Sequence, residues 1–272
     1  TVAASLHTPT AFATMFPGRH PPTHGVSGFH RSVPSRTDTL LDLDSHEAAF
    51  STGGANEWIC ERQKLFGTVD RTTLREADPP FVWINRHPGG HSPYGNFGAD
   101  GDGQSVDEYF EQHTQSDDRL ESNYQEAIND FVADVDETLT ELSRREIRDE
   151  TLVVVTSDHG ELLGEGGHVG HNFLPRPELV YVPTTLVHPE IQSERVSDGV
   201  ARHVDLYPTL LDALGSELPS DLPGQSLLSQ GVDADRGRPR RPGHPDKRRG
   251  PRSATGDGVP VSRSRHCQRR NA

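Results

Sequence analysis

One short run of residues constrains the fold more than any other part of the chain: Thr151-Leu152-Val153-Val154-Val155-Thr156. The run is β-branched or apolar almost throughout and lacks the polar alternation of a strand that faces water on one side. Such a composition is typical of a strand whose sheet is covered by helices on both faces. Residues 151–156 are therefore predicted to form a central strand.

Other segments supply the layers that such a strand needs. Residues 81–84 and 182–187 have the composition of further buried strands. Residues 117–148 repeat apolar side chains at helical spacing, and residues 204–214 predict a helix that stops at Gly215. Strands that alternate with helices predict an α/β fold with a mostly parallel sheet flanked by helices on both faces.

The charge of residues 1–231 is strongly negative. They contain 15 Lys and Arg residues against 37 Asp and Glu residues, and Lys64 is their only lysine. Such an excess is typical of a halophilic protein, because a very salty medium screens the self-repulsion. We expect no nucleic-acid partner. No apolar run is long enough to cross a bilayer, so we expect no membrane partner and a cytoplasmic location. The oligomeric state is left open.

The composition changes near residue 231. Residues 232–272 contain 12 basic and 4 acidic residues, with many arginines, prolines and glycines and few apolar side chains. Such a segment buries too little surface to offset its chain entropy. We therefore expect one domain over residues 1–230 and a disordered or aberrant basic tail over residues 231–272. The two cysteines, Cys60 and Cys267, indicate no disulfide framework.

Chemistry-bearing residues follow the strongest strand directly, in Ser157-Asp158-His159-Gly160-Glu161. In parallel α/β sheets, ligands gather beyond the carboxyl ends of the strands. Asp158 offers a carboxylate oxygen and His159 an imidazole nitrogen, a pair that suits a divalent ion. The alternative is an ordinary turn with a solvated aspartate.

The residues that follow carry a family resemblance. Leu162 to Asn172 contains four glycines and two histidines, His168 and His171, and leads into the strand that begins at Val182-Pro183. This order resembles the sulfatase family of the alkaline phosphatase superfamily, and the acidic composition is haloarchaeal-like. The resemblance implies an alkaline phosphatase-like fold, with Asp158 and His159 binding the metal and His171 contacting the anionic ester. His168 has no firm counterpart and is interpreted as a loop residue.

The same resemblance extends toward both ends of the chain. Gly90-His91-Ser92-Pro93-Tyr94, after the strand at residues 81–84, is similar to a family segment whose histidine lies at the substrate. His91 fits that role better than His87, although a proline-rich surface loop is the alternative. Residues 203–211 resemble a later helix of the family and are interpreted as packing rather than chemistry.

The family places its nucleophile at the start of a helix, about ten residues before Gly-Arg-x-Pro-x-x-His-Gly-Val. Residues 18–26 match that pattern, and ten residues before Gly18 stands Thr8, followed by Pro9. We expect Thr8 to cap a helix, where free N–H groups favour an oxyanion, and to lie close to Asp158 and His159. A purely capping role for Thr8 is the alternative.

Three features depart from the family pattern. Sulfatases proper convert the first residue of the motif Cys/Ser-x-Pro-x-Arg to formylglycine, which Thr8 does not allow, and Phe12 stands where that motif has arginine. Ser32-Val33-Pro34-Ser35-Arg36 spells the motif literally, but the second half of the pattern does not follow it. The family also opens with a strand that ends in two metal-binding aspartates, for which nothing stands before Thr8. We therefore expect an N-terminally truncated domain.

The resemblance implies a metal-dependent hydrolase of sulfuric or phosphoric esters, impaired by truncation. Thr8, His91 and His171 are the candidate catalytic residues, and a small-molecule ester is the expected partner. Calcium is the expected ion, with zinc, manganese and magnesium as alternatives. A non-catalytic remnant and a phosphatase or phosphodiesterase with a threonine nucleophile remain open. A secreted, acidic metal-binding module is less favoured, because Asp100-Gly101-Asp102-Gly103 lacks the spacing of a calcium loop.

Overall fold

A computed structural model describes residues 1–52, 54–94, 105–113, 117–172, 174–192 and 199–231. Residues 232–272, which hold almost all of the predicted tail, lie outside the described residues, as do Asp100-Gly101-Asp102-Gly103. Within the described residues, no helix is both long and apolar enough to cross a membrane.

The elements follow one another along the chain as helices and short strands. The α-helices are α1 (Thr8–Met15), α2 (Pro21–His24), α3 (Gly54–Glu57), α4 (Val106–His113), α5 (Asp117–Arg144), α6 (Pro177–Val180) and α7 (Leu206–Ala213). The strands are β1 (Glu47–Phe50), β2 (Asp70–Arg71), β3 (Phe81–Ile84), β4 (Val153–Thr156), β5 (Leu162–Leu163), β6 (Val169–Gly170) and β7 (Thr184–Val187). A π-helix, η1 (Trp58–Gln63), and the 3-10 helices η2 (Arg148–Glu150), η3 (Glu165–Gly167) and η4 (His203–Asp205) complete the set.

The predicted α/β class is confirmed, with a parallel sheet at its centre. β1 lies between β2 and β3 and runs parallel to both. The predicted central position of β4 is wrong within the described residues, because β4 pairs with β7 alone and antiparallel. The chain returns after β4 so that Thr184 lies opposite Thr156, and their hydroxyls are 2.8 Å apart. β5 and β6 form a separate antiparallel pair.

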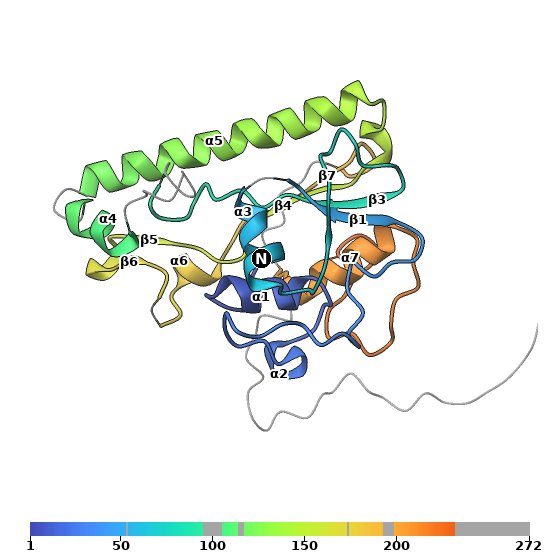
Figure 1. The fold of residues 1–272 in the computed structure, drawn as a ribbon, viewed down its shortest axis with the longest axis horizontal. Coiled ribbons are helices and arrows are strands. Elements are labelled where there is room, and N and C mark those ends of the chain that lie inside the picture. The colour runs from blue at the N-terminus through green and yellow to red at the C-terminus, as the bar shows by residue number, and fades with distance from the viewer. Residues whose placement is uncertain (53, 95–104, 114–116, 173, 193–198, 232–272) are drawn as a thin grey trace, which may run out of the picture. The chain divides into compact units, whose positions relative to one another are not determined.

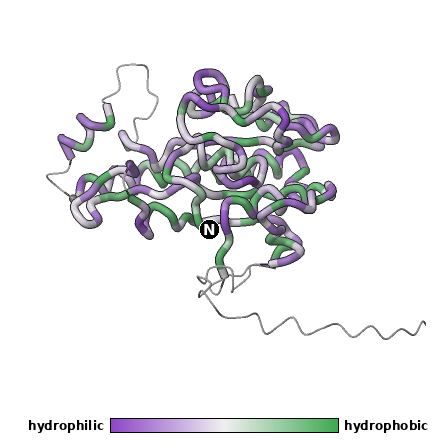
Figure 2. Tube along the Cα trace, turned by 90° about the horizontal axis from the view of Figure 1, so that it is seen from below, coloured by the Kyte–Doolittle hydropathy of each residue, from purple (hydrophilic) through white to green (hydrophobic). Residues whose placement is uncertain are grey.

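Helices cover the strands from two sides, as Figure 1 shows, with α5 along one side and α1 and α7 along the other. One buried cluster joins Phe12 of α1, Phe16 directly after that helix, Phe50 of β1, and Leu206 and Tyr207 of α7. Figure 2 shows hydrophobic residues gathered along the inner segments, with hydrophilic residues more frequent on the outer ones. Packing of α1 against α7 and β1 in this cluster therefore determines where the start of α1 lies.

On the other side, α5 is tied to the end of β3. The Asn85 amide donates to the Asp134 carboxylate at 2.7 Å, and the Phe131 ring lies 5.5 Å from the His87 ring. α5 is a long helix: its 28 residues, at 1.5 Å each, span about 40 Å. The loop that follows β3 is thereby held in place.

Residues 1–4 lie between two segments from the far end of the chain. Val2 forms one bridge to Tyr181 and another to Arg202. The Ala3 N–H donates to the Val180 carbonyl at 2.8 Å. These bonds fix the approach of the chain to α1.

Close backbone packing explains why a glycine follows Asp158 and His159 in the loop after β4. A side chain at Gly160 would overlap the Glu178 carbonyl oxygen, and the Gly160 N–H donates to the Leu179 carbonyl at 2.9 Å. We predict that Gly160→Ala lowers the free energy of unfolding by about 1–3 kcal/mol, because the backbone has to shift. Gly28→Ala is the control: its added methyl meets nothing within 4 Å, so a change within about 0.5 kcal/mol is expected. Equal losses in urea denaturation would contradict the packing argument.

Candidate active site

Thr8 is the first residue of α1 rather than its cap. His7 is the N-cap, in an extended conformation, and its carbonyl accepts the Ala11 N–H at 3.0 Å. The prediction that Thr8 caps the helix is therefore wrong by one position. The Thr8 hydroxyl is instead turned to the remote His159, whose Nε2 lies 3.3 Å from Thr8 Oγ1.

The loop after β4 holds Asp158 and His159 in a fixed arrangement. The Ser157 hydroxyl donates to the His159 carbonyl at 2.6 Å, and the His159 N–H donates to Asp158 Oδ1 at 3.1 Å. His159 Nδ1 lies 2.9 Å from the Gly160 carbonyl, which can only accept, so Nδ1 carries a proton. In the neutral ring, Nε2 is then an acceptor that lies near the Thr8 hydroxyl and 3.6 Å from Asp158 Oδ2.

The other two predicted residues extend this group. The His171 ring lies 4.4 Å from the His159 ring and 5.3 Å from the His91 ring. All five predicted residues, Thr8, Asp158, His159, His171 and His91, therefore form one continuous cluster. The predicted proximity of Thr8 to the Asp158–His159 pair is confirmed. The chemical role of each residue stays a prediction.

The two outer histidines differ in charge. Burial lowers the pKa of His91 to about 4, so its ring is neutral near pH 7 and offers hydrogen bonding rather than a full charge. Burial also lowers the pKa of His171, but Glu161 outweighs it and the pKa is raised overall. The Glu161 carboxylate accepts from His171 Nδ1 at 3.1 Å. His171 is thus the better candidate for a cation at the ester.

The sequence reasoning missed three residues beside the cluster. Glu161 is the last residue of the Asp-His-Gly-Glu run, so its signal was present but carried no assigned role. Burial, and after it the proximity of His159 and His171, lowers the pKa of His7, so His7 also lies close to the cluster. The Arg86 guanidinium lies 5.7 Å from the Trp58 ring centroid, and its positive charge helps to lower the pKa of Asp158. No local pattern could have identified Arg86.

Asp158 is the residue that best fits a cation. Burial would raise the pKa of its carboxyl, but His159, the Thr8 hydroxyl and Arg86 together hold that pKa below its ordinary value, so it is ionised. Its Oδ2 atom is buried and makes no hydrogen bond. An ionised, buried oxygen without a donor is suited to a metal ion. The set of metal ligands around Asp158 is incomplete, because in the described part of the chain no group of three or more His, Cys, Asp or Glu side chains could hold an ion.

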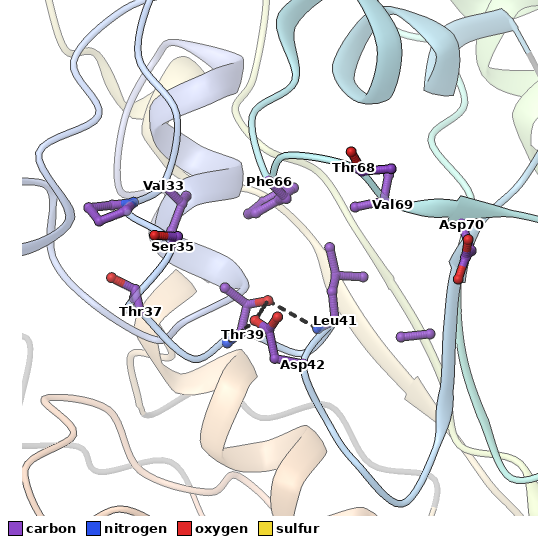
Figure 3. A pocket seen from close by; sticks show the side chains of 12 residues that line it. Val33, Ser35, Thr37, Thr39, Leu41, Asp42, Phe66, Thr68, Val69 and Asp70 are labelled. Carbon is purple, nitrogen blue, oxygen red and sulfur yellow. Dashed lines mark hydrogen bonds between the residues drawn. The ribbon is translucent and has the colours of Figure 1, made fainter.

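The remaining sequence candidates lie apart from the cluster or have structural roles. Ser32 is exposed and its hydroxyl donates to the Lys64 carbonyl at 3.0 Å. The pocket around this literal motif is lined by Val33, Ser35, Thr39, Asp42 and others, and contains none of the five cluster residues (Figure 3). His87 accepts the Gly89 N–H at 2.9 Å and shapes its own loop. His168 is an exposed loop residue, as expected.

Comparison with known proteins agrees with the geometry. The family model described as Sulfatase matches residues 3–216. The chain is 32% identical over 246 residues to the low-salt glycan biosynthesis sulfotransferase Agl7 of Haloferax volcanii. That alignment covers 87% of this chain and 59% of Agl7, so the chain spans less than two thirds of its relative.

Solved structures show the same fold. A 2-O GAG sulfatase superposes with a TM-score of 0.61 at 16% identity, over 84% of this chain and 64% of the other. The periplasmic domain of the phosphoethanolamine transferase EptC from Campylobacter jejuni gives a TM-score of 0.56 at 12% identity, over 79% and 76% of the two chains. With the family model spanning α1, β4, the site loop and α7, this chain belongs to the sulfatase family.

Proposed function

We propose that this chain hydrolyses sulfuric or phosphoric esters in a metal-dependent reaction with Thr8 as the nucleophile. The contact that carries the proposal is the 3.3 Å approach of Thr8 Oγ1 to His159 Nε2, across 151 residues of sequence and beside the ionised Asp158. A hydroxyl held at a helix start, where free backbone N–H groups favour an anion, suits attack on a tetrahedral ester. Membership of the sulfatase family supports an ester of this kind.

The residues of the cluster divide the work as follows. A bond forms from Thr8 Oγ1 to sulfur or phosphorus while the bond to the ester oxygen breaks, and the Thr8 proton leaves to solvent. The protonated His171 ring, whose Nδ1 donates to Glu161, stabilises the negative charge that develops on the ester. It can also protonate the leaving oxygen from Nε2. A water oxygen then bonds to the sulfur or phosphorus while the bond to Thr8 Oγ1 breaks. One water proton goes to Thr8 Oγ1, His171 regains its proton from solvent, and sulfate or phosphate is released. His91 contributes hydrogen bonding.

Asp158 and His159 are proposed to hold the divalent ion, through Oδ2 and Nε2. Calcium suits the carboxylate oxygen, and the imidazole leaves zinc, manganese and magnesium as alternatives. When bound, such an ion lowers the pKa of the nucleophile and draws charge from the ester oxygens. The acidic composition supports activity at high salt.

Transfer to an alcohol instead of water is a second candidate reaction of the same site. Two of the proteins that resemble this chain are named a sulfotransferase and a phosphoethanolamine transferase. An ester on a threonine oxygen can be attacked by an acceptor hydroxyl as well as by water. Turnover of an aryl ester with and without added alcohol, followed by mass spectrometry of the products, separates the two reactions.

We predict that Thr8→Ala lowers kcat/KM for aryl sulfate or aryl phosphate by at least about 10³-fold, because the nucleophile is lost. Thr8→Ser keeps the hydroxyl and should retain measurable turnover and a covalent ester detectable on residue 8. Thr10→Ala, in the same helix, is the control and should retain full turnover. If the unmodified chain turns over neither ester with any of the four ions, the chain is instead a non-catalytic remnant.

We predict that Asp158→Asn weakens divalent-ion binding more than the roughly 10–100-fold typical of residues that only orient ligands. The amide keeps the shape of the carboxylate but removes its charge. Isothermal titration with calcium, then zinc, manganese and magnesium, measures the effect. Asp134→Asn on α5 is the control, and an equal effect of both substitutions would argue against Asp158 as a ligand.

We predict that Glu161→Gln moves the alkaline limb of the kcat/KM profile to lower pH. The Glu161 carboxylate raises the pKa of His171, and the cation exists below that pKa, so removing the carboxylate makes the cation disappear at lower pH. The pH profile of ester hydrolysis measures the shift. Glu165→Gln lies in the same loop without contact to His171 and should leave the profile in place; an unmoved profile in Glu161→Gln would contradict the role of His171.

A further inference from the structure

His203 connects the two parts of the chain that form the cluster. Its Nδ1 lies 3.2 Å from the Ala4 N–H, and its Nε2 lies 3.1 Å from the Ser157 carbonyl. An amide N–H can only donate and a carbonyl can only accept, so the neutral ring carries its proton on Nε2. Ala4 stands four residues before Thr8, and Ser157 directly precedes Asp158.

The ring itself is held rigidly. His203 is 0% exposed, and its backbone N–H donates to the Val2 carbonyl at 3.1 Å. Asp205, in the same 3-10 helix, accepts from the Arg202 N–H at 2.8 Å and from the Gln225 N–H at 3.0 Å. A buried side chain fixed on both sides can hold a distance between the groups it bonds.

Each of the two His203 bonds holds one of the segments that meet at the contact between Thr8 and His159. The bond to Ala4 holds the segment that leads into α1, and the bond to Ser157 holds the loop that carries Asp158 and His159. The other end of this loop is held by the Gly160 bond to Leu179. Among the described residues, the two His203 hydrogen bonds are the side-chain connection between residues 1–4 and the start of the loop after β4.

We propose that His203 is a positioning residue that sets the separation of Thr8 from the Asp158–His159 pair. The inference rests on the proposed function, in which that separation governs attack by Thr8. His203 touches neither Thr8 nor His159 in this arrangement, so it acts through Ala4 and Ser157. The sequence alone had suggested only a packing role for the segment that begins at His203.

Three substitutions separate the two hydrogen bonds. His203→Gln places an amide N–H near the position of Nε2 and can keep the bond to Ser157. His203→Asn places a carbonyl oxygen near the position of Nδ1 and can keep the bond to Ala4. His203→Phe keeps the ring volume and loses both bonds. Each variant is assayed below its melting temperature, where circular dichroism shows it to be folded.

We expect kcat to fall by roughly 10–100-fold in His203→Asn and His203→Phe, as for other residues that orient active-site groups. His203→Gln should lose less than about 10-fold, because it keeps the bond to Ser157 while the backbone bonds of Val2 and Ala3 still hold residues 1–4. KM should stay unchanged in all three variants, because His203 does not touch the ester. A purely structural role would make the loss of kcat follow the loss of stability, without a difference between Gln and Asn. That outcome, or full kcat in His203→Phe, would overturn the proposal.

His24 provides a matched control. It is a second buried histidine, 2% exposed, whose Nε2 lies 3.1 Å from Thr14 Oγ1 and whose Nδ1 accepts the Val26 N–H at 3.1 Å. His24→Phe removes as many bonds as His203→Phe but none that reaches the loop after β4. It should lower the melting temperature and leave the kcat of the folded enzyme unchanged. A fall in kcat equal to that of His203→Phe would overturn the proposal.

A second readout keeps the inference separate from the proposed function. In nuclear magnetic resonance spectra, the Thr8 side chain and the His159 ring should show a nuclear Overhauser contact in the wild type and in His203→Gln, and lose it in His203→Phe. If the wild type hydrolyses no ester, the proposed function fails, and this contact alone decides the positioning role. Its retention in His203→Phe would overturn that role.

Discussion

The rest of the site depends on the hydrogen bonds that hold residues 1–4 between two distant segments. Val2 bridges Tyr181 on one side and Arg202 on the other. Because α1 begins only a few residues later, these bonds, with the aromatic packing beneath α1, decide where its first residue lies. The Thr8 hydroxyl then reaches His159 without any contact inside α1 having to direct it. Thr8 is thus placed by backbone pairing rather than by the loop after β4.

The local features of this site could be predicted from the sequence, and the contacts that assemble it could not. Asp158 and His159 stand directly after the most apolar strand, and Thr8 stands at a fixed spacing before a recognisable pattern. The carboxylate partner of His171 and the two bonds of His203 join residues that no periodicity relates. The antiparallel pairing of β4 depends likewise on the path of the loop that follows it, which strand composition does not specify.

The site is electrostatically unlike the protein around it. Residues 1–231 carry 37 acidic and 15 basic residues, whereas at the cluster the Arg86 guanidinium and His171, whose pKa is raised, stand against the two carboxylates of Asp158 and Glu161. Under the proposed function, an anionic ester is repelled at long range by the acidic protein and meets the two positive groups only at contact. Salt shortens the range of the repulsion from about 10 Å at 0.1 M to about 3 Å at 1 M and affects buried contacts far less. Under the proposed function, rising ionic strength therefore weakens the long-range repulsion of the ester more than it weakens the ester's contacts in the site.

The placement of residues 1–4 also determines when the site can exist during synthesis. Ala4 and its partner His203 are 199 residues apart, and at a synthesis rate of about 5–20 residues per second they are made roughly 10–40 s apart. Through that interval α1 has none of its partners from the last third of the domain, whereas α5 can form from local contacts alone. Thr8 therefore reaches its final position beside His159 only after His203 has been made, which makes assembly of the site a late step of folding on the ribosome.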